Sequence, residues 1–149
     1  MSYHAAVVLV ACLSCTWVSA QPVILVTEME AKASEAAGGM LIPRVTPTPG
    51  APRITVVTPD ISKPVSAPTS IEVKFVSNPP AEPKPESFRA MYGAFRIDVT
   101  ERLLGVTRVT KDGFRVTNAV LPAGRHQLLL SLTDSMGRQA QQVLAFTVE

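Results

Sequence analysis

The chain has 149 residues, a length typical of one domain, and its 14 Lys and Arg residues against 12 Asp and Glu residues give a net charge of +2. So balanced a charge gives no sign of an electrostatic partner and disfavours nucleic acid binding. Thirteen prolines, eight glycines and only 5% aromatic residues favour short strands and extended connections over packed helices.

The first twenty residues have the pattern of a secretory signal peptide. They contain no Asp, Glu, Lys or Arg, are largely apolar, and end in the small residues Ser19 and Ala20. His4 stands where such a peptide usually carries Lys or Arg. A transmembrane helix would need about 20 apolar residues without the polar ones found here. We therefore expect residues 1–20 to be removed and the protein to be periplasmic or secreted.

A second interpretation of this segment is a lipoprotein signal. Leu9-Val10-Ala11-Cys12 resembles the lipobox of bacterial lipoproteins, in which the cysteine is acylated and becomes the N-terminus. Cys12 would then be the lipidation site, and the protein would be lipid-anchored in the outer membrane. Both cysteines of the chain lie in this segment, so cleavage after Ala20 leaves no thiol for a disulfide.

Simple cleavage predicts that the exported protein begins at Gln21, because the small residues at positions 19 and 20 suit a signal peptidase. The intact mass of the protein recovered from its native envelope measures this. An acylated species that begins at Cys12 would establish the lipoprotein interpretation and make the membrane a partner.

Residues 21–51 are expected to form a short helix followed by a proline-rich linker. Thr27 and Glu30 have the spacing of a capping box, the alanines that follow favour a helix, and Gly38-Gly39 would end it. The apolar surface of this helix is mostly alanine methyls, so we expect it to pack weakly. Four prolines between Met40 and Pro52 predict an extended connection of about 3 Å per residue.

Residues 52–149 contain short runs of alternating apolar and polar residues, separated by Pro- and Gly-rich stretches, which predicts strands. The predicted strands before the last hairpin are Arg53 to Thr58, Ser70 to Ser77, Phe88 to Tyr92, Phe95 to Thr100, Gly105 to Thr110 and Phe114 to Ala119. Asn78 to Ser87 is expected to be a loop. Within the fourth strand, alternation predicts that Phe95, Ile97 and Val99 point inward.

The closing stretch Leu121 to Glu149 predicts a β-hairpin. Two rows of apolar or aromatic side chains recur at a spacing of two: His126, Leu128, Leu130 and Leu132, then Leu144, Phe146 and Val148. Between them, Asp134 and Gly137 are residues that favour a tight turn. A hairpin alone is marginally stable in water, so the other strands must cover its apolar face.

Several of these features together resemble a known class of domain. About seven short strands, a Pro-Ala-Gly turn, the run His126 to Thr133, the turn D-S-M-G-R and the closing A-F-T-V are similar to a bacterial immunoglobulin-like or fibronectin type III-like domain. The resemblance covers Pro52 to Glu149 and implies an all-β fold, an immunoglobulin-like antiparallel β-sandwich. The domain has no cysteine pair, no Trp and no Tyr in its last strands, so an antibody-type domain is not implied.

The sequence offers little for catalysis or metal binding. After removal of the signal peptide, His126 is the one histidine and no cysteine remains, so a zinc site lacks ligands. A triad of His126 with Asp98 or Asp134 and a serine has no supporting G-x-S-x-G motif. We expect no enzyme, no metal and no cofactor, and we expect His126 to be a partly buried histidine at a strand end.

These observations favour a non-catalytic, exported interaction or structural module of the cell envelope, which binds protein. The alternative is a carbohydrate- or peptidoglycan-binding module, although Tyr92 is the only Tyr or Trp in the domain that could stack on a sugar ring. The identity of the partner and the oligomeric state are left open.

A place for partner contact is expected where the alternation fails. Leu103 and Leu104 are adjacent, and in an extended chain they cannot both point inward. With Tyr92, the exposed one would form an apolar patch onto which a partner docks or adds a strand. The competing interpretation is a helical turn from Thr100 to Leu104 that buries both leucines.

Overall fold

A computed structural model describes residues 22–39 and 48–149; the predicted signal peptide with Cys12, and residues 40–47 of the predicted linker, lie outside the described residues. The elements are β1 (Val23–Ile24), α1 (Glu28–Ala36), β2 (Arg53–Thr58), β3 (Thr69–Val76), β4 (Pro83–Tyr92), β5 (Ile97–Asp98), α2 (Thr100–Leu104), β6 (Gly113–Val120), β7 (Gly124–Asp134) and β8 (Gln139–Val148). The described part is therefore mostly strand, as the alternating sequence predicts.

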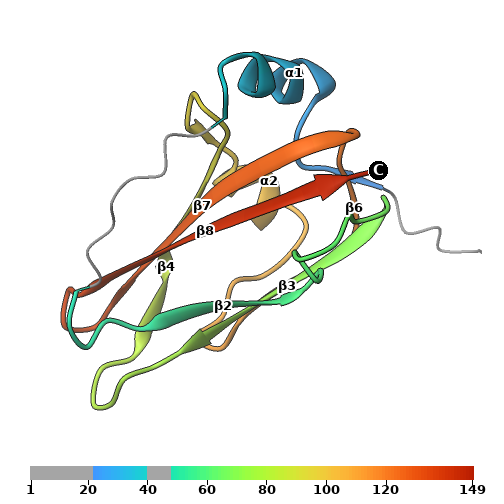
Figure 1. Ribbon diagram of the computed structural model, residues 1–149. Coiled ribbons are helices and arrows are strands. Elements are labelled where there is room, and N and C mark those ends of the chain that lie inside the picture. Colours follow the sequence, from blue (N-terminus) through green and yellow to red (C-terminus); the bar gives the residue numbers. More distant parts are fainter. Residues whose placement is uncertain (1–21, 40–47) are drawn as a thin grey trace, which may run out of the picture.

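The strands form two sheets of four, ordered β1-β6-β3-β2 and β5-β4-β7-β8 (Figure 1). Every pairing in them is antiparallel except that of β1 with β6. One hydrophobic core joins the inner faces of both sheets. At its centre the ring of Phe88 from β4 lies 5.9 Å from Phe75 of β3 and 5.1 Å from Phe114 of β6. The predicted all-β, two-sheet architecture is confirmed.

The hairpin of β7 and β8 matches its prediction closely. Its inward side chains are all buried: His126, Leu128, Leu130, Leu132, Leu144, Phe146 and Val148. In the turn, Oδ1 of Asp134 accepts hydrogen bonds from the amides of Met136 and Arg138, each at 2.9 Å, and Gly137 has φ +78°. Burial alone would raise the pKa of Asp134, but the hydrogen bonds from Arg138 and Met136 lower it below its ordinary value.

The prediction of a loop from Asn78 to Ser87 is wrong in its second half, because β4 begins at Pro83. The register against β7 shifts between Lys84 and Arg89, where Pro85 lacks a main-chain donor. The hydroxyl of Ser87 makes up for the interruption, since it accepts from the Thr133 amide at 2.8 Å and donates to the Lys84 carbonyl at 2.6 Å. The Ser87 side chain thus completes the hydrogen bonding between β4 and β7, which the sequence pattern does not predict.

The predicted strand from Phe95 to Thr100 is also mostly wrong. Arg96 has φ +49°, which breaks the extended chain, and β5 contains only two residues. Phe95 is 64% exposed rather than inward, Ile97 is half-buried, and Val99 is buried as expected. The predicted strand from Gly105 to Thr110 is absent, because a turn and a loop follow helix α2 in this part of the chain.

Helix α1 begins with a complete capping box. The Thr27 hydroxyl accepts from the Glu30 amide at 3.3 Å, and the Glu30 carboxylate accepts from the Thr27 amide at 2.9 Å. Glu30 also pairs with both terminal nitrogens of Arg102 in α2, each at 2.8 Å. The buried Ser34 hydroxyl accepts from the Ala94 amide at 3.0 Å. These contacts fix α1 across one end of the sandwich (Figure 1), so it packs more firmly than its alanines suggest.

The Glu30→Gln variant should be less stable to urea by about 1 kcal/mol, because glutamine keeps the cap but loses the bidentate ion pair. The hydrogen bond from Arg102 lowers the pKa of Glu30 from 4.5 to about 2, so its contribution is present above pH 4.5 and lost as the pH falls toward 2. The matched control is Glu28→Gln on the same helix, whose side chain is 79% exposed. Equal losses in both variants would contradict a special role for Glu30.

Candidate binding groove between β2 and β8

The predicted apolar patch keeps one of its candidate residues at the surface and loses Tyr92. Tyr92 is fully buried and Leu103 is 4% exposed, whereas Leu104 is 43% exposed. The reason is that α2 is a helical turn, which directs Leu103 into the core and leaves Leu104 outside. The expectation that one of the two leucines is exposed is therefore confirmed, with Leu104 as the exposed one, but Tyr92 is buried and cannot join it. The competing expectation is confirmed in its helical turn from Thr100 to Leu104 and wrong in burying Leu104.

Tyr92 and His126 form a buried polar pair. Nε2 of His126 lies 2.7 Å from the carbonyl oxygen of Pro122, so this nitrogen carries the proton and donates it. Nδ1 then accepts from the Tyr92 hydroxyl at 2.9 Å. Burial lowers the pKa of His126, and burial together with the charges of Glu30 and Glu35 raises the pKa of Tyr92 to about 12. Both side chains stay neutral and hold strands β4 and β7 together.

Other kinds of site find little support in the part of the chain that the structure describes. Over residues 22–39 and 48–149 there is no group of three or more His, Cys, Asp or Glu side chains that could hold a metal ion. No helix within those ranges is both long enough and apolar enough to cross a membrane. The surface of the described part also carries several hollows, one of which is a groove between two edge strands.

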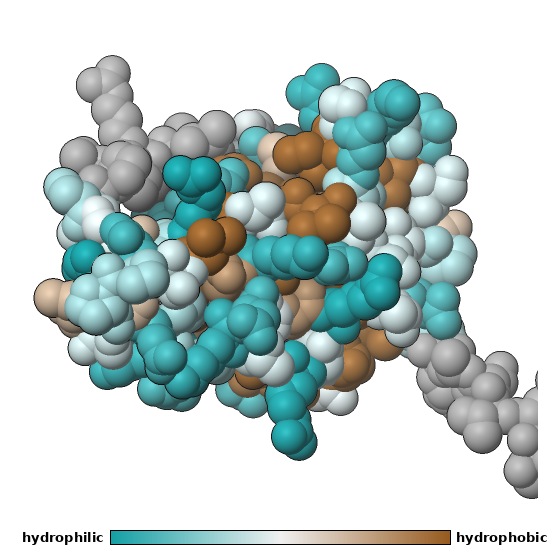
Figure 2. All heavy atoms as spheres, turned by 90° about the horizontal axis from the view of Figure 1, so that it is seen from below, coloured by the Kyte–Doolittle hydropathy of each residue, from teal (hydrophilic) through white to brown (hydrophobic). Residues whose placement is uncertain are grey.

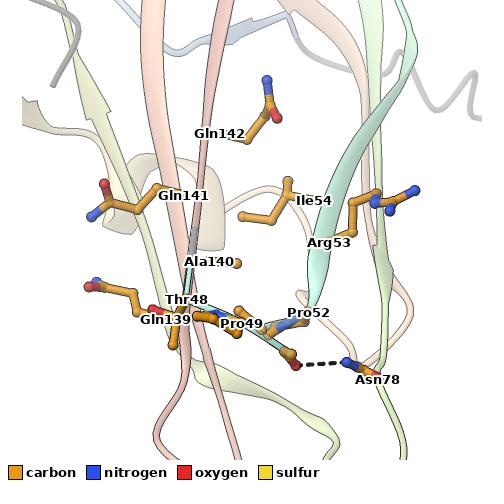
Figure 3. A pocket seen from close by; sticks show the side chains of 12 residues that line it. Thr48, Pro49, Pro52, Arg53, Ile54, Asn78, Gln139, Ala140, Gln141 and Gln142 are labelled. Atoms are coloured by element: carbon orange, nitrogen blue, oxygen red, sulfur yellow. Dashed lines mark hydrogen bonds between the residues drawn. The ribbon is translucent and has the colours of Figure 1, made fainter. Parts of the chain in front are cut away.

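This groove lies between the edge strands β2 and β8 and has a volume of about 540 Å³ (Figure 3). Such a volume falls within the range of small ligand sites in proteins. Three segments line it, namely 48–54, Asn78 and 139–142. These segments lie far apart in the sequence and meet only because β2 and β8 are neighbouring edges of the two sheets.

The floor of the groove is apolar and its rim is rich in amides. Ile54 and Ala140 are buried and face each other across the gap, as Figure 3 shows. Gln142 occupies an inward position of β8, between the buried Ala140 and Leu144, and yet it is exposed, which marks the seam between the sheets as open here. Its side-chain nitrogen donates to the Val143 carbonyl at 2.9 Å.

One end of the groove is closed by a braced turn. The Ala51 amide donates to the Thr48 carbonyl at 3.0 Å, and the Asn78 side chain donates to the Gly50 carbonyl at 3.2 Å, the dashed line in Figure 3. Arg138, itself paired with Asp134, donates to the Asn78 carbonyl at 3.3 Å. Gly50 has φ +78°, and a Cβ there would collide with the Arg138 guanidinium, so this wall requires glycine.

The main chain of β8 adds donors and acceptors to the groove. The Val65 amide donates to the Thr147 carbonyl at 2.8 Å, and the Glu149 amide donates to the Val65 carbonyl at 3.0 Å. The main-chain N–H and C=O groups of Thr147 and Glu149 therefore point away from β7. Main-chain N–H and C=O groups change direction at every residue of a strand, and the β7–β8 register is unbroken. The main-chain groups of Gln139, Gln141 and Val143 therefore also point away from β7.

The groove is close to electrically neutral. Among its described lining residues Arg53 is the only charged one, no carboxylate is present, and Figure 3 shows the Arg53 side chain directed away from the gap. A neutral, amide-rich rim suits main-chain amides and hydroxyl groups better than ions. The face seen in Figure 2 is largely hydrophilic, with hydrophobic residues interspersed.

Comparison with protein-family models, with curated proteins and with solved structures found no match. The ligand class of the groove must therefore follow from its own geometry and chemistry.

Proposed function

We propose that this chain is an exported, non-catalytic interaction module of the cell envelope, which binds protein through the β2–β8 groove. The observation that carries the proposal is the groove itself. It has a braced wall, an apolar floor at Ile54 and Ala140, and a rim of amide side chains and outward main-chain groups. This combination of a shaped apolar floor and polar rim is typical of sites for protein segments.

The strand order supports an immunoglobulin-like domain. Counted from β2, the first sheet takes the first, second and fifth strands, and the second sheet takes the fourth, third, sixth and seventh. Immunoglobulin-like sandwiches place strands A, B and E in one sheet and C, F and G in the other, which gives β8 the place of strand G. The short parallel β1 beside β6 is a departure from that plan. Many extracytoplasmic domains of this kind bind other proteins, which supports the proposal by analogy.

The envelope location rests on the sequence pattern of residues 1–20, and its two forms are a cleaved periplasmic or secreted protein and one lipidated at Cys12. Amide side chains such as Gln139 and Gln141 would also suit sugar hydroxyls, so carbohydrate or peptidoglycan binding is the second candidate. It is the weaker one, because the domain's single tyrosine is buried and no aromatic residue is among the described groove lining.

Site-specific photo-crosslinking in the native cells tests the proposal. A photoreactive residue placed at Gln141, in the groove, should yield a protease-sensitive adduct with a protein partner. The matched control is Thr117 on β6, which is exposed and outside the groove. Adducts of equal yield at both positions, or none at Gln141, would overturn the groove as the binding site. Co-sedimentation of the purified protein with insoluble peptidoglycan, lost on groove substitution, would favour the second candidate.

A further inference from the structure

Strand β8 differs from the other edge strands of the described sheets. Strands β1 and β5 have two residues each, and β2 carries a register shift between Val56 and Thr58. Strand β8 instead makes ten consecutive pairs with β7 without a shift, and it contains neither a proline nor a charged residue. Proteins protect exposed edges with short strands, bulges, prolines or charges. Strand β8 has none of these devices and is therefore suited to pairing.

The chain itself shows that this edge accepts another strand. Val65 bridges to Val148 and exchanges two hydrogen bonds with the outward groups of the last strand, but the pairing stops there. The Lys63 amide, which would be the next donor of a parallel ladder, donates to the Asp60 carbonyl at 3.3 Å instead. From Val143 to Gln139 the outward groups of β8 line or adjoin the groove. Among residues 22–39 and 48–149 no strand pairs with this part of β8 on its outward side, and at about 3.4 Å per residue it spans roughly 15 Å.

We propose that the partner of this module contributes an extended peptide segment, which adds to the open edge of β8 as a further strand and lays an apolar side chain over Ile54 and Ala140. This inference rests on the proposed function and specifies how the groove recognises protein. The row of outward amides and carbonyls matches the main chain of an extended peptide, whatever its sequence. The neutral rim then selects against charged side chains, and the floor selects for an apolar one.

Two features of the groove bear on the occupant. The braced turn from Thr48 to Pro52 lines the groove together with the start of β8, so a segment that pairs with this end of β8 lies against the turn. The Gln142 side chain, which donates to the Val143 carbonyl, occupies one of the acceptors that a new strand needs. It must release this carbonyl on binding, so Gln142→Ala should strengthen peptide binding.

The probe is a phage-displayed library of random nonapeptides, selected on the mature protein, and the best peptide is then synthesised. Gln141→Pro removes an outward amide, while Gln141→Ala removes only the side chain. We expect Gln141→Pro to weaken peptide binding at least about tenfold and Gln141→Ala to change it less than about threefold. Bound peptide should slow the hydrogen exchange of the Gln141 and Val143 amides. When the peptide amides are N-methylated one at a time, binding should be lost at every second position, because only those amides face β8.

The outcomes are separable from those of the crosslinking experiment. If Gln141→Pro does not fold, as judged by its thermal melt, the period of two in the N-methyl series and the exchange data on the parent protein still decide. Failure to select any peptide, or peptide binding without protection of these amides, overturns strand addition. Concentration-dependent protection of the same amides without peptide would make a second copy the occupant and overturn it as well. A protein adduct at Gln141 could still be found in those cases, which would leave the proposed function standing.

Discussion

Replacing Phe88 with alanine is expected to lower the free energy of unfolding by about 3–5 kcal/mol, the largest loss we predict for a single substitution. Phe88 is 1% exposed, and its ring contacts Phe75 and Phe114 from the opposite sheet. Alanine would remove the apolar transfer energy of the ring and leave a cavity where the two sheets meet, in a core that relaxes only partly. Urea denaturation followed by circular dichroism measures the change.

The control is the same substitution at Phe95, which should change the stability by less than about 0.5 kcal/mol because this ring is 64% exposed. Comparing the two variants also tests where Phe95 lies. The structure places its ring outside, whereas strict alternation with Ile97 and Val99 would place it inside. A large loss of stability in Phe95→Ala would show that Phe95 points inward and would contradict the turn at Arg96.

The closing hairpin could be predicted from the sequence because its information is local. His126, Leu128, Leu130 and Leu132 recur at a spacing of two, although Leu129 between them is buried as well. Asp134 and Gly137 supply the turn chemistry three residues apart. Each residue there needs only its near neighbours to fix its direction. The capping box at Thr27 and Glu30 is local in the same sense.

The prediction of inward and outward side chains failed where a single residue with positive φ reverses the directions of the side chains that follow it. Arg96 has φ +49°, and Asn118 has φ +55°, which lets Ala119 turn inward after Phe114 and Val116. Positive φ at Arg is unusual and has no sequence signal, so the alternating pattern of the sequence runs through Arg96 without a break. The adjacent leucines at 103 and 104 did mark such a break, but not its geometry.

The groove could not be predicted because its parts come together only in the folded sheets. Residues 48–54 and 139–142 are nearly a hundred positions apart, and their contact depends on β2 and β8 being the two edges on one side. One signal was present in the sequence: from Gln139 to Val148 there is no charge and no proline. In an edge strand that composition indicates an interaction site, but only the strand order shows that β8 is an edge.

Mild acid should destabilise the fold through His126. In the folded protein the ring donates from Nε2 to Pro122 and accepts at Nδ1 from Tyr92, so a second proton has no place without breaking the buried pair. Burial keeps the pKa of His126 below 6.5, whereas the unfolded chain takes up the proton near 6.5. The stability is therefore complete above pH 6.5 and is lost as the pH falls toward the lower, folded-state pKa.

Because one proton is involved, the free energy of unfolding should fall by at most about 1.4 kcal/mol per pH unit below pH 6.5. The carboxylates with lowered pKa values, Glu30, Asp60, Asp98 and Asp134, start from ordinary values of 4.5 or 3.8, so their losses come at lower pH and the range from 6.5 to about 5.5 isolates His126. Urea denaturation of the mature protein at several pH values across this range measures the slope. His126→Gln can keep an acceptor for Tyr92 and a donor for Pro122 without titrating, so its stability should hardly change over the same range. A parent protein with no slope would show that the folded state accommodates the protonated ring, and a variant with the parent's slope would assign the titration to another group.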